Sequence, residues 1–424
     1  MNTLINTCLI GCGLHGASRL APAIQTNEGA VLAGCVDADV EIAQAVAGPE
    51  TPVSTELREL LLQTDMDAAV VAVPHDQLAP VTLQCLEAGL HVLVEKPMAL
   101  NESEASDLVA AAVANKRVLM PAYCLRFNTV RTRAHTHVRN GLSGATKTLA
   151  AAKGSPPLTG WLADRTRGGG QLLFLGSHLV DQILWLHPQP VVQVFAAIQD
   201  RADGRSEESI SGLIEFSDGV SATISLSQGA GTAYDHIEIT GSGGRIGSDW
   251  KSGQISLDLE DHPSYPAPVI EHVRTDPFQP MYDAEFSEFV NAIRGNREPS
   301  VTANDGLRVL KILDGLRSSA TQGTPIELFD KGPSPTTVEN DDLSLARVRV
   351  QFTYAADSIR RPIIYELSQR FDLTFDIRRA DVDAGIGWIQ LLLEGDRNEL
   401  DAAIAWAESQ GVRASPVEGD VISG

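Results

Sequence analysis

The sequence predicts an α/β protein of three parts: a doubly wound parallel sheet, an α+β domain with a large, mostly antiparallel sheet, and a small βαββαβ unit of the ferredoxin-like type at the C-terminus. Three observations carry this prediction. Buried strands alternate with amphipathic helices over residues 3–123, apolar and polar residues alternate from about 144 to 260, and a second alternating series follows residue 342. At 424 residues the chain is long enough for more than one core.

The first domain is expected over residues 1–125. Its strand candidates are short apolar runs rich in Val, Leu and Ile, which read LINTCLIG, AVLAGCVD, AAVVAVP, HVLVEKP and RVLMPAY. The stretches between them, such as NESEASDLVAAAVANK, carry apolar residues at helical spacing. Strands that alternate with helices in this way form parallel sheets buried on both faces, so a doubly wound sheet is expected.

The second domain is expected over residues 126–330. Its middle part changes to a period of two residues, as in SGLIEFSDGVSATISLSQG and DHIEITGSGGRIGSDW, where turn residues separate the alternating strands. Two helical segments follow, MYDAEFSEFVNAIRG and TANDGLRVLKILDGLRSSATQG. The pattern therefore predicts a largely antiparallel sheet with helices after it.

A polar stretch at residues 331–341 has few apolar side chains to bury and is interpreted as a linker. Residues 342–424 then form a separate small unit, which begins with the alternating strand ARVRVQFTY. The residues on one stripe of the helix that follows are Ile359, Ile363, Leu367 and Phe371. Two further strands, a second helix and a closing strand complete the βαββαβ order of a ferredoxin-like sandwich.

The composition excludes several classes of function. A formal charge of -22 argues against binding to nucleic acid or to anionic lipid, because phosphate groups need a basic surface. No apolar run approaches the roughly 18 residues of a membrane helix. The N-terminus lacks a basic leader and a cleavage site, so a cytoplasmic location is expected. The five cysteines are expected to be small buried apolar residues: Cys8, Cys12, Cys35, Cys85 and Cys124.

A basic cluster, RFNTVRTRAHTHVRNG at residues 126–141, is expected to be the solvated face of a helix rather than a binding site. Its His135 and His137 stand two residues apart, so on a helix they point in different directions and cannot share a metal ion. No metal site is expected elsewhere in the sequence.

The stretch LIGCGLHGASRL, residues 9–20, contains a G-x-G-x-x-G pattern formed by Gly11, Gly13 and Gly16. The pattern follows an apolar strand and begins an amphipathic helix, and Asp37 lies at the end of the next strand. This is the context of a dinucleotide-binding Rossmann fingerprint. Gly11 permits the tight turn, Gly13 lets a pyrophosphate approach the backbone, and Gly16 allows close helix packing. The free N–H groups of the helix N-terminus favour the phosphate charge.

Asp37 is expected to accept hydrogen bonds from the ribose hydroxyls of the adenosine. Asp39 is also acidic and no Arg lies nearby, so a 2′-phosphate would be repelled. The sequence therefore predicts NAD as the cofactor, with NADP less favoured.

Two further residues are candidates for chemistry. Lys96, in HVLVEKPMAL, follows a predicted buried strand, where ligands of open α/β sheets bind, and it could polarise a substrate oxygen. His178, in RGGGQLLFLGSHLVDQILWL, lies on a helix of the second domain and could take the proton of a hydroxyl group. The alternatives are a lysine that reaches solvent from a strand end and a histidine satisfied within the core.

Together, GCGLHG, EKPMAL, GGGQLLFLGSHLVDQILWL and YDAEFSEFVNAIRGNREPSVTANDGLRVLKIL resemble the glucose-fructose oxidoreductase, inositol dehydrogenase and MocA (Gfo/Idh/MocA) family over about residues 3–329. The resemblance implies a Rossmann domain followed by an α/β domain whose open sheet makes the subunit contact in homodimers or homotetramers. It also implies NAD(P)-linked oxidation or reduction of sugars, polyols and related small molecules.

The resemblance also implies roles for single residues. Lys96 is then the active-site lysine and His178 the acid/base histidine. The residues implied at the substrate are Arg126, Asp181 and Tyr282. Those implied to hold the cofactor are Gly11, Gly13, Leu14, His15, Gly16, Asp37, Pro74, Glu95 and Lys96.

Two departures from the family pattern matter. Sugar and inositol dehydrogenases usually carry an aspartate four residues before the histidine, and this chain has Phe174. A carboxylate there would stabilise the charged imidazole, whereas an aromatic ring desolvates it and lowers its basicity. The family's frequent histidine after the fourth strand is replaced by Leu78, with His75 displaced nearby. Reduction of a carbonyl or imine, or an unusual substrate, is therefore favoured slightly over ordinary sugar oxidation.

Residues 342–421 resemble the NIL domain of methionine-importer ATPases, where paired copies bind an amino acid. GIGWIQLLLEGD and AAIAWAESQGVRASPV carry this resemblance. It implies either a sensor of an amino acid or sulfur metabolite, or a dimerisation module with an empty groove.

Three hypotheses of function follow from these observations. The first is an NAD-dependent oxidoreductase that transfers hydride between nicotinamide and a small substrate. The second is a non-catalytic, NAD-bound sensor whose tail binds an amino acid. The third is NAD-assisted cleavage of a glycoside, in which the bound cofactor is recycled.

Overall fold

The computed structural model of the chain describes residues 4–328 except 230, 261 and 274–277. In the C-terminal part it describes residues 346–354, 363, 367, 370, 371, 373–383, 386–395, 397–410 and 412–416. The chain divides into two compact units, Met1–Pro333 and Ser334–Gly424. The predicted linker at 331–341 lies outside the described residues, and the predicted boundary at residue 125 within the first unit stays a prediction.

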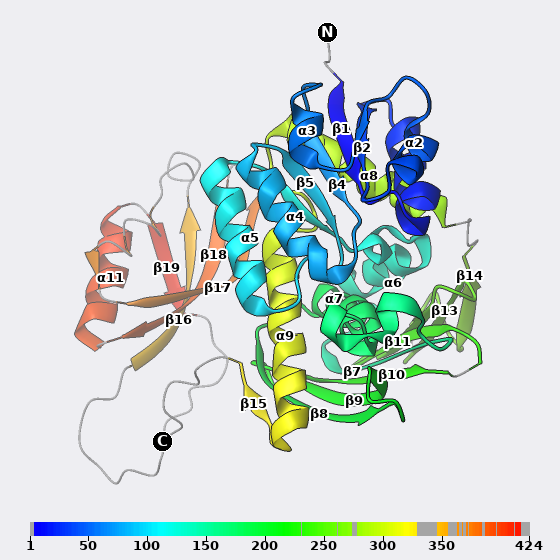
Figure 1. The fold of residues 1–424 in the computed structure, drawn as a ribbon. Helices are drawn as coiled ribbons and strands as arrows, with labels where there is room; N and C mark the ends of the chain where they lie inside the picture. Colours follow the sequence, from blue (N-terminus) through cyan, green and yellow to red (C-terminus); the bar gives the residue numbers. More distant parts are fainter. Residues whose placement is uncertain are drawn as a thin grey trace. The chain divides into compact units, whose positions relative to one another are not determined.

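The first sheet has six parallel strands in the order β3-β2-β1-β4-β5-β6, drawn in blue and cyan in Figure 1. This is the strand order of a dinucleotide-binding Rossmann fold, so the predicted doubly wound sheet is confirmed. The strands are β1 (Ile5–Ile10), β2 (Ala30–Val36), β3 (Val53–Ser54), β4 (Ala68–Val71), β5 (His91–Glu95) and β6 (Leu119–Ala122). The helical segments between them are η1 (Gly16–Leu20), α1 (Ala21–Thr26), α2 (Val40–Ala47), α3 (Leu57–Leu61), α4 (His75–Glu87) and α5 (Glu102–Asn115).

Local sequence explains these elements. All four residues of β4 are buried, as expected for a central strand with both faces covered. The side chains of Asp39 and Asn101 cap α2 and α5, because each accepts a backbone N–H of the first turn. Sequence analysis missed β3 and α3, since elements of two and five residues are too short to show a period.

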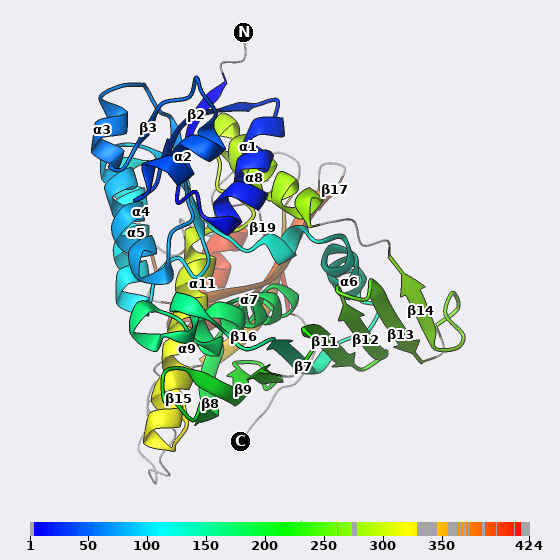
Figure 2. The same ribbon diagram turned by 45° about the vertical axis from the view of Figure 1, so that its right-hand side comes forward.

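The second sheet has nine strands in the order β14-β13-β12-β11-β7-β10-β9-β8-β15 (Figure 2). Among these described strands, β7 and β10 run parallel and all other neighbours are antiparallel. The predicted mostly antiparallel sheet is therefore confirmed. Its strands are β7 (Thr146–Ser155), β8 (Val191–Asp200), β9 (Glu207–Phe216), β10 (Ser221–Gln228), β11 (Tyr234–Gly241), β12 (Gly244–Asp249), β13 (Gln254–Leu259), β14 (Val269–His272) and β15 (Ile326–Glu327).

Helices α7 (Ser177–Leu186) and α9 (Ala303–Gln322) pack on one face of this sheet. Their buried Ile183 and Leu313 belong to the same hydrophobic core as Ile224 of β10 and as the buried residues of the first sheet. One continuous core therefore joins the two halves of the first unit.

Polar contacts fasten the two halves further. Helix α8 (Gln279–Gly295) returns to the first sheet, where the side-chain amide of Asn27 donates to Ser287 Oγ at 3.0 Å. On α9, the carboxylate of Asp314 accepts the backbone N–H of Glu102 at 2.7 Å. These contacts fix the position of the first sheet relative to α8 and α9.

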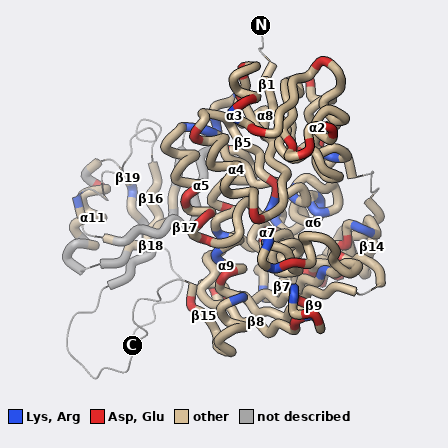
Figure 3. Tube along the Cα trace, in the orientation of Figure 1, with Lys and Arg blue, Asp and Glu red and all other residues tan. Residues whose placement is uncertain are grey.

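Helix α6 (Thr129–Arg139) carries much of the basic cluster, seen in blue in Figure 3. Arg131 is only 2% exposed, and its guanidinium pairs with Asp235 of β11. The expectation of a solvated basic face is therefore wrong for Arg131, which lies on the side of the helix that packs against the sheet. His135 stacks on Trp185 with the ring centroids 3.9 Å apart.

The C-terminal unit contains a four-stranded antiparallel sheet in the order β17-β18-β16-β19. Its elements include β16 (Ala346–Tyr354), β17 (Thr374–Asp383), β18 (Ile386–Gly395), α11 (Arg397–Ser409) and β19 (Val412–Pro416). The predicted ferredoxin-like fold is confirmed. Ile363 and Leu367 are buried in one core with Val350 and Leu391, as the predicted helical stripe requires, whereas Ile359 lies outside the described residues.

All five cysteines are buried and unpaired, as predicted. In the part of the chain that the structure describes, no group of three or more His, Cys, Asp or Glu side chains could hold a metal ion. None of the described helices combines the length and the apolar character that crossing a membrane requires.

Candidate functional site

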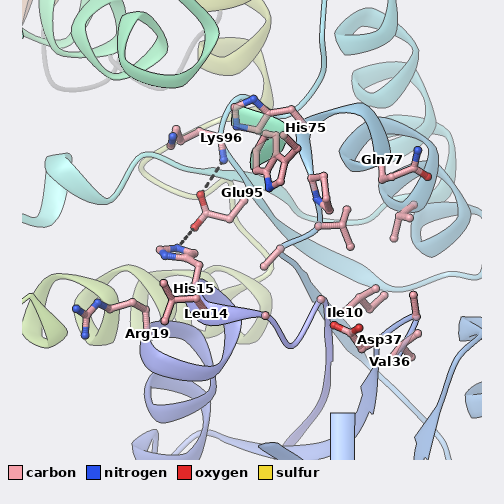
Figure 4. Close-up of a pocket in the computed structure, with 18 of the residues that line it drawn as sticks. Ile10, Leu14, His15, Arg19, Val36, Asp37, His75, Gln77, Glu95 and Lys96 are labelled. Atoms are coloured by element: carbon pink, nitrogen blue, oxygen red, sulfur yellow. Dashed lines mark hydrogen bonds and ion pairs between the residues drawn. The ribbon is translucent and has the colours of Figure 1, made fainter. Parts of the chain in front are cut away.

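A cavity of about 1030 Å³ lies at the carboxyl ends of the first sheet, where open α/β sheets bind their ligands (Figure 4). One wall consists of the ends of β1, β2, β4 and β5. The other wall comes from α7, α8 and three short helical turns, η3 (Gly160–Ala163), η4 (Arg165–Arg167) and η5 (Leu172–Gly176). Besides His178 and Tyr282, the lining includes every residue implied to hold the cofactor except Gly16: Gly11, Gly13, Leu14, His15, Asp37, Pro74, Glu95 and Lys96.

The three glycines of the first turn meet three different constraints. Gly11 has a φ of +92°, and a Cβ there would lie 2.4 Å from the carbonyl oxygen of Ala72. A Cβ on Gly16 would lie 2.1 Å from the carbonyl oxygen of Gly11, so only glycine permits this close turn. A Cβ on Gly13 would meet nothing within 4 Å. The space beside Gly13 is open to a ligand, which fits the approach of a pyrophosphate.

Asp37 directly follows β2, and two backbone groups hold its carboxylate at the cavity. The N–H of Cys12 donates to Oδ2 at 2.7 Å, and the N–H of Asp39 donates to Oδ1 at 3.0 Å. The described lining next to Asp37 is Val36, Ala38, Thr55 and Glu56, none of them basic. This end of the cavity therefore fits the free ribose hydroxyls of NAD.

Lys96 directly follows β5, and its ammonium group lies inside the molecule. Nζ donates to the backbone carbonyl of Phe174 at 3.1 Å and stands 4.6 Å from the centre of the Phe174 ring. Burial lowers the pKa of Lys96 to about 8, although the neighbouring Glu95 carboxylate opposes this shift. Lys96 is thus a cation at neutral pH that is poorly solvated, which suits a group that polarises an oxygen atom.

His178 lies on α7 in the opposite wall of the same cavity. Its Nδ1 is buried and has no hydrogen-bond partner among the described residues. Burial, followed by the charges of Lys96 and Lys153, lowers the pKa of His178 well below its ordinary value. The imidazole is therefore neutral at physiological pH. It can donate or accept a hydrogen bond, but the protonated form is disfavoured.

Phe174 occupies the position at which the family resemblance implies an aspartate, and in the structure it contacts Lys96. Its ring and its carbonyl oxygen both face Lys96. Nδ1 of His178 has no carboxylate or other hydrogen-bond partner among the described residues. An aspartate would bring a negative charge to this wall. Phe174 instead offers the lysine an uncharged ring in a cation–π contact.

His15 and Glu95, both implied to hold the cofactor, contact each other across the cavity (Figure 4). Nε2 of His15 lies 2.8 Å from Oε1 of Glu95, and the His15 ring meets Tyr282 edge to face at 5.4 Å. Burial by itself would raise the pKa of Glu95, but His15 and Lys96 outweigh it and lower the pKa. Glu95 is therefore ionised at neutral pH.

Arg126 and Asp181 are brought together by the fold, but neither belongs to the cavity lining described above. The guanidinium forms a two-pronged ion pair with the carboxylate, with Nη2 to Oδ1 at 2.6 Å and Nε to Oδ2 at 3.2 Å. Nη1 also lies 3.3 Å from Asp305. The two side chains satisfy each other, and their contact with a substrate stays a prediction.

Sequence reasoning missed several residues of the second wall, among them Trp161, Leu162 and Arg167. Trp161 meets His75 edge to face with the ring centroids 4.7 Å apart. Nδ1 of His75 donates to the carbonyl of Gly168 at 2.7 Å, and burial lowers the pKa of His75 to about 4. The run of glycines that begins at Gly168 was the available signal, because it lets the chain pass close to His75.

Comparisons with known proteins agree with this geometry. The model of the oxidoreductase family with an NAD-binding Rossmann fold matches residues 5–123, the GFO/IDH/MocA C-terminal domain matches 132–247, and the NIL domain matches 348–415. Inositol 2-dehydrogenase of Rhizobium meliloti is 25% identical over 328 residues, which cover 74% of this chain and 98% of that protein. The 1,5-anhydro-D-fructose reductase of Ensifer adhaerens is 26% identical over 285 residues, or 65% of this chain and 83% of that protein.

The same similarity holds among solved structures. GenD2 from gentamicin A biosynthesis, in complex with NAD, superposes with a TM-score of 0.68 at 25% identity and covers 76% of this chain and 96% of that chain. The open glycine turn, the carboxylate held by backbone groups and these matches define an NAD-binding oxidoreductase. The chain belongs to the Gfo/Idh/MocA family, and it carries a NIL domain at residues 348–415.

Proposed function

We propose that this protein transfers hydride reversibly between NAD and a carbonyl or alcohol carbon of a small molecule such as a sugar, a polyol or a related metabolite. The observation that carries the proposal is that Lys96 and His178, from opposite walls, line one cavity that begins at the glycine turn. The relatives named for inositol 2-dehydrogenase and 1,5-anhydro-D-fructose reductase act on this substrate class.

The chain's own residues have distinct tasks in this proposal. Asp37 and the turn at Gly13 hold the adenosine and pyrophosphate parts of NAD, which supplies the hydride acceptor or donor. The Lys96 ammonium polarises the substrate oxygen, and His178 is the acid/base partner that the family pattern implies. Because Phe174 leaves His178 without a carboxylate, carbonyl or imine reduction and unusual substrates come slightly ahead of sugar oxidation.

The test is a substrate panel with the full-length protein. Sugars, polyols, keto acids and imines are offered with NAD⁺ or NADH, and net formation or loss of NADH is followed. Turnover with at least one of them, abolished in Lys96→Ala, supports the proposal. Tight NAD binding without turnover across the panel contradicts it.

Two other functions are alternatives to hydride transfer with net turnover, and one observation favours the first of them. The unpartnered Nδ1 of His178 favours a non-catalytic, NAD-bound sensor, since a weakly basic imidazole is a poor proton carrier. NAD-assisted cleavage of a glycoside uses the same hydride donor and acceptor but recycles the cofactor. Release of sugar without net NADH separates this third function from the first.

For the C-terminal unit we propose an amino-acid ligand, and for the whole chain a homodimer or homotetramer in the cytoplasm. The match to the NIL domain supports the ligand. A rise in melting temperature on adding methionine, measured beside a set of other amino acids, tests it. Light scattering tests the subunit number, and a monomeric species would contradict that part.

A further inference from the structure

The ammonium group of Lys96 is contacted twice by one residue of the opposite wall. Nζ donates to the backbone carbonyl of Phe174 at 3.1 Å, and it also stands 4.6 Å from the centre of the Phe174 ring. A lysine has three N–H groups to donate. The carbonyl takes one of them and the ring lies against the ammonium as well, so Lys96 has little capacity to hold more than one substrate oxygen.

The backbone at Phe174 explains this double contact. Leu172–Gly176 form η5, which is wound as a π-helix and leads directly into α7. Single π-helical turns are rare and occur frequently at functional sites. Here the turn presents both the carbonyl and the ring of Phe174 to Lys96, and His178 follows four residues later in the same wall.

The distances place the Phe174 ring beside the proposed substrate. An oxygen that accepts a hydrogen bond from Lys96 lies about 2.8 Å from Nζ. Because Nζ stands 4.6 Å from the ring centre, that oxygen lies at most about 7.4 Å from the ring centre. Both side chains line the same cavity. Substituents on the carbon atoms next to the reacting carbon can therefore make van der Waals contact with an uncharged ring.

The polar groups closest to this position already have partners within the protein. Five groups act through their charge on Lys96, on His178 or on both: Glu95, Cys124, His15, His75 and Lys153. Glu95 and His15 bond to each other at 2.8 Å, and Nδ1 of His75 bonds to a backbone carbonyl. Nζ of Lys153 bonds to Asp235 at 2.7 Å, and the thiol of Cys124 is a weak donor. Additional hydroxyl groups on a substrate would find few partners here beyond the hydroxyl of Tyr282.

This distribution of polar groups discriminates between substrates. A hydroxyl group buried without a partner loses its hydrogen bonds to water, whereas a hydrocarbon group that packs on an aromatic ring gains by leaving water. An aspartate at position 174 would accept hydrogen bonds from substrate hydroxyls, and Phe174 cannot. The wall that faces Lys96 thus favours hydrocarbon over hydroxyl groups next to the reacting carbon.

We propose that Phe174 is a specificity-determining residue, and that the substrate is a ketone or secondary alcohol whose neighbouring carbon atoms carry hydrogen or hydrocarbon groups in place of hydroxyl groups. This inference rests on the proposed function and narrows its substrate class. Lys96 holds the one oxygen of such a substrate, and the Phe174 ring packs on the hydrocarbon beside it. Sugars and polyols carry hydroxyl groups next to the reacting carbon and are then poor substrates.

The main experiment uses three ketones built on one six-membered ring: cyclohexanone, its derivative with one hydroxyl group beside the carbonyl, and pentahydroxycyclohexanone. Reduction of each by the full-length protein with NADH is followed at neutral pH, where Lys96 is charged. We expect kcat/KM to fall by about 10- to 100-fold from the first ketone to the second, and further to the third, because each added hydroxyl group is buried without a partner. Equal values, or a preference for pentahydroxycyclohexanone, would overturn the inference.

Substitutions at Phe174 test whether this side chain sets the preference. Phe174→Asp supplies an acceptor for hydroxyl groups and should make pentahydroxycyclohexanone the best of the three ketones, whereas Phe174→Leu keeps an apolar wall and should keep the wild-type order. Phe174→Asn, which is polar and uncharged, gives the same test where the Asp variant is too unstable to purify. An unchanged order in the Asp and Asn variants rejects the inference.

Controls separate specificity from folding. Val113→Asp puts the same carboxylate on α5 at a position that is 74% exposed and outside the cavity, and it should leave all three kcat/KM values unchanged. NAD affinity within about threefold of wild type shows that a Phe174 variant has kept its cofactor site, since the altered contact is to the substrate.

A second readout does not depend on turnover. A ketone cannot be reduced when the cofactor is NAD⁺, so the rise in melting temperature that each ketone causes with saturating NAD⁺ reports its affinity. Wild type should bind cyclohexanone at least about 10-fold more tightly than pentahydroxycyclohexanone, and Phe174→Asp should lose this difference. Equal binding of the two ketones, or binding of neither, rejects the inference.

The failure of this inference and the failure of the proposed function give different results. Preferential binding of cyclohexanone without turnover of any compound in the panel contradicts the proposed function and supports the inference. Turnover with pentahydroxycyclohexanone as the best of the three ketones supports the proposed function and rejects the inference.

Discussion

At the scale of single residues, the two side chains that sequence reasoning placed at the active site have their charges set by their surroundings. Burial brings the pKa of Lys96 from 10.5 to about 8 and drives that of His178 well below 6.5. Lys96 remains a cation at neutral pH, whereas His178 is neutral. At neutral pH Lys96 therefore supplies a positive charge near the proposed substrate oxygen, and His178 stands in the opposite wall as a neutral imidazole.

Replacing Lys96 by Ala removes that positive group. We expect kcat to fall by about 100-fold, comparable to the loss of one electrostatic donor in other enzymes, while the Kd for NAD changes by less than about threefold. Steady-state kinetics and a direct NAD titration measure the two effects. Equal losses in turnover and in NAD affinity would assign Lys96 to cofactor binding instead.

The pKa of Lys96 also sets an alkaline limit. Because the ammonium loses its proton as pH rises through about 8, kcat/KM of the wild type should fall above that pH. Phe174→Asp puts a carboxylate beside the ammonium, which favours the charged form, so the falling limb should move to higher pH. Phe174→Leu is the control for losing the ring, and a limb that moves equally in both variants would exclude the carboxylate as the cause.

The ion pair of Arg126 and Asp181 gives a contrasting residue-scale prediction. Arg126→Ala leaves a carboxylate in the interior without its partner, so the free energy of unfolding should fall by about 3–5 kcal/mol. Denaturant unfolding measures this loss. If Arg126 instead binds substrate as the family resemblance implies, KM should rise while the unfolding midpoint stays near that of wild type.

At the scale of elements, the turn between β1 and η1 contains two glycines with different roles. Gly16 is required by close packing within the turn, whereas Gly13 faces open space that a ligand can occupy. Gly16→Ala forces a Cβ to 2.1 Å from the Gly11 carbonyl, so it should cost about 1–3 kcal/mol of stability. Gly13→Ala meets no protein atom, so its melting temperature without NAD should match wild type, while NAD affinity falls because the methyl group occupies the pyrophosphate's space. Unchanged NAD affinity in Gly13→Ala would show that the dinucleotide does not pass this turn.

Helices and strands were predictable from the sequence where they are long enough to show a repeating spacing of apolar residues. The strands and helices of the first sheet other than β3 and α3, the alternating strands of the second sheet and the βαββαβ order of the last unit follow from local spacing. The parallel pairing of β10 with β7 was not predictable, because α7 and the two strands β8 and β9 lie between them along the chain. Register and neighbour choice depend on packing against α7 and α9, which a sequence period does not report.

At the scale of the whole molecule, the cavity lies entirely within the unit that ends at Pro333. A chain that stops there should therefore bind NAD with the affinity of the full-length protein and keep its turnover. It should lose any thermal shift caused by an amino acid. Loss of NAD binding on truncation, with the melting temperature preserved, would mean that the C-terminal unit contributes to the cofactor site.

The sequence by itself determined the order of the three folds and the glycine turn with Asp37 at the end of the next strand. It also identified Lys96 and His178 as candidates for the active site. These features are local, since the spacing of apolar residues and of glycines is written within single elements. They were sufficient to indicate NAD and an oxidoreductase.

Only the tertiary structure decided which side chains meet. It pairs His15 with Glu95, 80 residues away, and Arg126 with Asp181, 55 residues away, and it turns Arg131 inward onto Asp235. The physical reason is that protonation state depends on burial and on neighbours that lie far apart along the chain. For that reason the protonation states of Lys96 and His178 are set by the folded cavity, where both side chains are buried.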